Sequence, residues 1–281
     1  QDDVKDAINH AKNYDPKTQN LYWSAHGKGR LNEATSWLKT YVHEMGHQVH
    51  FTNNCWINSF IETYVEAYGN LNFSKVLTTL NSSIKTSSMN FHIRKNGNLN
   101  LKVFNREKSK EDIRVYLKEK NASAKVSGIL LSNKNFDSDI LCKIVHEGEN
   151  TFSDQKWRLI SIDNSRTSIN GKICVNKGAK KSNASFVSKS LILNDKSSSF
   201  SKPELEILED DVKCQHGASF GEIDKDIIFY LQSRGIKKYD AMIMLIYAFI
   251  NEIGYVKEGH DNIVLQEIDN IIKNIGKNDQ S

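Results

Sequence analysis

Residues 98–105 read NLNLKVFN, and this stretch decides the fold because its apolar residues fall at every second position. Leu99, Leu101 and Val103 would lie on one face of an extended chain, since successive side chains of a strand point to opposite faces. The same alternation recurs in DIRVYLKE (112–119) and PELEILED (203–210). We therefore predict a long series of short strands that begins near residue 84.

The strand pattern continues to about residue 223 and then gives way to helix. Short polar turns rich in Asn, Ser, Lys and Gly separate the strands, and no helical pattern interrupts them. This excludes a doubly wound sheet and leaves a sandwich, a barrel or a β-helix, among which periodicity alone does not choose. From Asp224, DKDIIFYLQSRGI predicts a helix that stops near Gly235, and the apolar KKYDAMIMLIYAFINEIGYV (237–256) predicts another.

The N-terminal quarter has a different pattern. SWLKTYVHEMGHQVHF (36–51) and WINSFIETYVEAYG (56–69) place apolar residues three and four positions apart, as amphipathic helices do. We therefore expect a small helical segment over residues 1–72, a β core over 73–223 and a helical domain over 224–281.

The composition indicates a globular protein and excludes several classes. The 281 residues carry 38 Lys and Arg against 34 Asp and Glu, and no block of like charge predicts a nucleic-acid partner. No run reaches the roughly 20 apolar residues of a membrane span. The four cysteines are far apart, so no disulfide framework is predicted and a cytoplasmic location is expected. The chain opens on Gln1, which suggests a fragment, a processed product or a trimmed chain.

The motif HEMGH at residues 43–47 predicts a zinc site if it lies on a helix. His43 and His47, four residues apart, would then share a face and bind one Zn²⁺, with Glu44 as the general base that deprotonates a metal-bound water. Glu62 is the expected third ligand, and Glu66 lies one helical turn beyond it. The alternative is that both histidines are ordinary solvated or core residues.

The region from about residue 20 to residue 70 resembles a gluzincin-type zinc metallopeptidase, in which an ExxxE helix follows HExxH. By that resemblance Glu62 is the zinc ligand and Glu66 an outer partner that holds a histidine. One function hypothesis is therefore a zinc peptidase with a β-rich accessory domain.

The opposite end of the chain resembles a second family. PELEILEDDVKCQHGASFGEIDKDIIFYLQSRGI (203–236) is similar to the C-terminal signature of the SufB/SufD family of iron–sulfur cluster assembly proteins, and GKICVNKGAKKSNASF (171–186) resembles its repeated β-helix coils. The forms CQHGA and FYLQSRG favour the SufD branch. The resemblance spans roughly 180 residues.

This second resemblance implies a right-handed parallel β-helix followed by a C-terminal helical domain. It further implies a noncatalytic scaffold that pairs with a SufB-like subunit and docks a SufC-like ATPase through the helical domain of residues 224–281, with a transient iron–sulfur cluster at the partner interface. The implied location is the cytoplasm, or the plastid stroma in a eukaryote. This is the main function hypothesis.

The residue that the family resemblance singles out is His216, which matches a histidine implicated in cluster building, with Cys214 beside it. Neutral imidazole is a ligand for iron. We expect Cys214 to point to the opposite face of a regular strand, so that both reach one iron only if the backbone turns. The alternatives are a conformational turn with Gly217 at positive φ and a Cys214 that serves as a small buried hydrophobe.

The two resemblances compete for one chain. Three accounts are open for residues 1–72: a natural fusion, an artefactual join of two truncated frames, or an N-terminal region in which HEMGH arose by chance. The SufD-like part is the larger match in each account.

Overall fold

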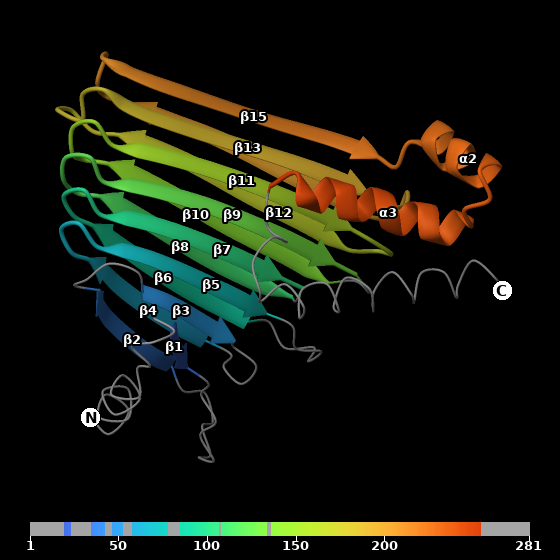
Figure 1. Ribbon diagram of the computed structural model, residues 1–281, viewed down its shortest axis with the longest axis horizontal. Coiled ribbons are helices and arrows are strands. Elements are labelled where there is room, and N and C mark those ends of the chain that lie inside the picture. The colour runs from blue at the N-terminus through green and yellow to red at the C-terminus, as the bar shows by residue number, and fades with distance from the viewer. Residues whose placement is uncertain are drawn as a thin grey trace.

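The computed structural model describes residues 20–23, 35–42, 47–52, 58–77, 85–106, 108–133 and 136–253, which form a stack of strands followed by two helices (Figure 1). The strands are β1 (Asn20–Trp23), β2 (Thr35–Val42), β3 (His47–Thr52), β4 (Asn58–Val65), β5 (Asn70–Leu77), β6 (Lys85–Ile93), β7 (Asn98–Asn105), β8 (Ser109–Leu117), β9 (Ser123–Ser132), β10 (Asp137–His146), β11 (Phe152–Ser161), β12 (Arg166–Val175), β13 (Ser182–Ile192), β14 (Ser198–Ile207) and β15 (Val212–Glu222). The helices are α2 (Lys225–Ser233) and α3 (Lys238–Asn251).

Successive strands alternate between two parallel sheets. The odd-numbered strands form the first sheet in the order β1-β3-β5-β7-β9-β11-β13-β15, and the even-numbered strands form the second, from β2 to β14. Each strand therefore pairs with the strand two positions later in the chain, as in a parallel β-solenoid. The prediction of a mainly β fold with a parallel β-helix and C-terminal helices is confirmed.

The interior of the solenoid is filled by the alternating apolar residues. Leu99, Leu101 and Val103 of β7 are fully buried, and so are the large rings of Trp157 and Phe186 in later coils. Full burial of an aliphatic or aromatic side chain stabilises the folded state by about 1.5–3 kcal/mol. The period-2 pattern thus becomes one continuous core between the sheets.

Asparagines at one row of turns fix the register between coils. Asn96, Asn121 and Asn150 all have positive φ, a conformation that Asn tolerates better than most residues. The side-chain amide of Asn121 donates to Asn96 over 2.8 Å, and that of Asn150 donates to Asn121 over 2.7 Å. The ladder repeats the same turn in successive coils.

The C-terminal helices follow β15, and α3 packs across the outer face of the first sheet (Figure 1). Asp224 caps α2 by accepting from the backbone N–H groups of Asp226 and Ile227, and the chain leaves α2 at Gly235, whose φ is +84°. The helix stop predicted at Gly235 is confirmed. Ile246 and Ile250 of α3 pack on the outer face of the first sheet, against Phe104, Ile129, Leu131, Ile160 and Leu191.

The prediction of helices over 36–51 and 56–69 is wrong, because β2, β3 and β4 occupy these segments. NSFIETYV also alternates, and in β4 the branched residues Ile61, Thr63 and Val65 are buried while Glu62 and Tyr64 are half-exposed. β4 pairs with β2 and β6, so parallel neighbours satisfy its backbone. The expected boundary at residue 72 falls inside β5, which pairs with β3 and β7.

Candidate functional site

The last coil of the solenoid leaves its inner face exposed. β15 ends the first sheet and β14 ends the second, so within the described residues no strand pairs with their outer edges. Residues that would be core in an earlier coil are exposed here: Leu205 is 36% exposed, Ile207 42% and Phe220 52%. We call the exposed face of β14 and β15 the open end.

Cys214 and His216 both lie on the inner side of β15 at the open end. Their register partners on β13 are Ala184 and Phe186, which are fully buried in the interior. The expectation that the two residues point to opposite faces is therefore wrong, because residues two apart in a strand share a face. No turn of the backbone is needed to bring them to one side.

The environments of the two side chains differ. Cys214 is half-buried against the core, and burial raises the pKa of its thiol, whereas His216 is exposed. Gly217 pairs with Val187 inside the regular strand and does not have positive φ, so the conformational-turn alternative is wrong. The alternative of Cys214 as a small buried hydrophobe is met in part, because its side chain packs against the core but is only partly buried.

A thiol and an imidazole on one face are a partial ligand set for iron. Alternate residues of a strand are about 6.6 Å apart, a span that matches two ligands on different irons of one cluster better than two on one iron. Among the described residues no three His, Cys, Asp or Glu side chains form a group that holds a metal ion.

A second exposed apolar surface lies on the helices. Ile227 is 43% exposed, Phe229 73% and Tyr230 55% on α2, which projects beyond the ends of the strands (Figure 1). Sequence reasoning missed this surface. The signal was the run Ile227–Ile228–Phe229–Tyr230, because four consecutive apolar residues cover every side of a helix and only Ile228 is buried.

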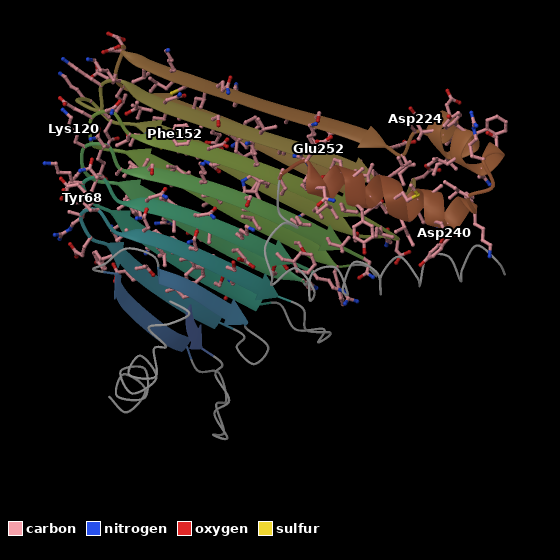
Figure 2. The ribbon with its side chains drawn as sticks, in the orientation of Figure 1. Tyr68, Lys120, Phe152, Asp224, Asp240 and Glu252 are labelled. Atoms are coloured by element: carbon pink, nitrogen blue, oxygen red, sulfur yellow. The ribbon has the colours of Figure 1, made fainter. Side chains whose placement is uncertain are left out.

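The end of α3 is anchored to the sheet by charged groups. The Arg158 guanidinium of β11 donates to the backbone oxygen of Phe249 over 3.0 Å and to the carboxylate of Glu252 over 2.7 Å. Lys189 also donates to Glu252, and these hydrogen bonds lower the pKa of the Glu252 carboxyl. Figure 2 shows Glu252 at the end of α3. The anchor holds α3 in place and leaves α2 at the periphery.

Only part of the predicted zinc site lies within the described residues. His43 and Glu44 lie outside the described residues, and His47 opens β3, so the helix expected to present HEMGH is replaced by strand on its C-terminal side. Glu62 accepts from the Tyr64 hydroxyl over 2.9 Å and lies 3.5 Å from His92 Nε2.

The expected outer partner of that site is also engaged elsewhere. Glu66 lies 3.1 Å from the guanidinium of Arg94. The described geometry gives no support to a zinc peptidase.

Comparison with known proteins places these features in one family. The model for "SUF system FeS cluster assembly, SufBD core domain" matches residues 35–249. This match crosses residue 72 and includes β2, β3 and β4, which the fusion and join hypotheses assigned to another protein.

Curated relatives share shorter segments with the chain. The iron–sulfur cluster assembly protein SufD of Escherichia coli is 36% identical over 137 residues, which are 49% of this chain and 32% of that protein. A chloroplastic protein of Arabidopsis thaliana is 34% identical over 116 residues (41% and 24%), and the iron–sulfur cluster assembly protein SufB of Bacillus subtilis is 29% identical over 134 residues (48% and 29%). Each match thus spans a third or less of the relative.

No helix in the described part of the chain is long and apolar enough to cross a membrane.

Proposed function

Because this chain belongs to the SufBD core domain family of SUF system iron–sulfur cluster assembly proteins, we propose that it is a SufD-like scaffold on whose open end a nascent cluster is built. The 36% identity to the SufD protein and the forms CQHGA and FYLQSRG support the SufD branch. The cluster is the cargo of this process. The observation that carries the proposal is the shared exposed face of Cys214 and His216.

The partner at the open end is a SufB-like subunit. The outer edges of β14 and β15, which no described strand pairs, lie beside exposed apolar residues and are suited to association through added strands. Pairing would cover Leu205, Ile207 and Phe220 and would bring further cluster ligands from the partner. His216 then binds iron through a neutral imidazole nitrogen, and Cys214 contributes a thiolate once iron replaces its proton.

Cluster reconstitution tests this site. The chain is co-purified with a SufB-like subunit and a SufC-like ATPase from one organism, and cluster formation from iron and sulfide is followed by visible absorbance. We expect His216→Ala to lower the cluster yield about tenfold or more, with a smaller loss for Cys214→Ser. The matched control is His92→Ala, which removes a half-buried histidine of β6, far along the stack from β15.

Pairing must be measured in the same samples. Size-exclusion chromatography is expected to show an intact complex for both site variants. An unchanged cluster yield in His216→Ala, with the complex intact, would refute the assignment of the site.

The ATPase docks on α2 in this proposal. Ile227, Phe229 and Tyr230 give α2 an apolar outer surface, and helix faces of this kind are common docking elements. Phe229→Glu is expected to abolish co-purification of the SufC-like ATPase, as is deletion of residues 224–281. Phe152→Glu, at an exposed phenylalanine of β11, is the control that should keep binding. Retained binding by Phe229→Glu would exclude this surface.

The location that we propose follows the SUF machinery: the cytoplasm, or the plastid stroma in a eukaryote. Matches to bacterial proteins and to a chloroplastic one support it.

A further inference from the structure

We draw no further inference here: the strongest candidate, the exposed apolar side of α3 around Met244 and Ala248, carries no proposal because nothing in the described part of the structure shows what covers it.

Discussion

Gly171→Ala is expected to destabilise the solenoid strongly, because the aromatic ring of Phe186 occupies the place of the missing Cβ. A Cβ built on Gly171 would lie 1.8 Å from Cε2 of Phe186, with two further ring atoms at 2.3 and 2.4 Å. Carbon atoms pack at about 3.5–4.0 Å. Phe186 is fully buried in the core, so its ring has no solvent to turn into, and the backbone of β12 or β13 must shift. Overpacking of this kind costs about 1–3 kcal/mol, and three close ring atoms favour the upper part of that range.

A double-mutant cycle isolates the clash. Phe186→Leu alone is expected to cost about 1–2 kcal/mol through lost packing. In that background Gly171→Ala should lose most of its cost, which gives a coupling free energy of about 1–2 kcal/mol. The assay is urea denaturation followed by circular dichroism, with the midpoint and slope fitted for each variant.

Gly217→Ala is the matched control, because Gly217 lies in β15, the strand that pairs with β13 of Phe186, has no atom within 4 Å of its built Cβ and does not have positive φ. It should be neutral or stabilise by up to about 1 kcal/mol. The reasoning is refuted if Gly171→Ala is as mild as Gly217→Ala, or if its full cost persists beside Phe186→Leu. Phe186 is the register partner of His216, so the same cycle also measures the packing energy of β13, the strand that pairs with the candidate site strand β15.

Three further predictions concern buried polar groups. Burial lowers the pKa of His146 from 6.5 to about 4, so on acidification the unfolded chain takes up the proton first. The free energy of unfolding should therefore fall by about 3 kcal/mol as the pH drops from 6.5 to 4. In His146→Gln the urea midpoint should depend less on pH across this range. The ammonium of Lys75 lies 3.0 Å from the carboxylate of the fully buried Glu111. Lys75→Met leaves that carboxylate without its charged partner and should lower the free energy of unfolding by about 3–5 kcal/mol. The double variant Lys75→Met with Glu111→Leu should recover most of this loss in the same urea assay. Arg158→Ala removes the donor to Phe249 and Glu252, so amide hydrogen exchange across residues 238–251 should accelerate while β9 stays protected.

Strands were predicted correctly from sequence where the two-residue alternation does not also fit the three- and four-residue spacing of a helix. Leu99, Leu101 and Val103 match only the two-residue repeat, and they are buried as predicted. The segment NSFIETYV matched both periods, and its helix assignment failed because pairing of β4 with β2 and β6 outweighs local periodicity.

The role of the candidate site stays a prediction, and its geometry was predicted incorrectly. The CQHGA motif singled out Cys214 and His216, but counting strand positions separated two residues that share a face. The exposure of Leu205, Ile207 and Phe220 was not predictable from alternation, because their pattern is the same as that of a core strand. What exposes them is the position of β14 and β15 at the end of the stack, which only the assembled topology reveals.

One strand links the two surfaces on which the proposed function depends. Cys214 and His216 lie in β15, which ends at Glu222, and α2 begins three residues later at Lys225. Among the described strands β15 pairs with β13 alone, so fewer of these ladder hydrogen bonds oppose its displacement than oppose that of an inner strand. α3 is anchored through Arg158 and Glu252, whereas α2 buries a single residue, Ile228. In the proposed function, a partner that moves α2 would therefore act on β15, and on Cys214 and His216 within it, through a two-residue connection.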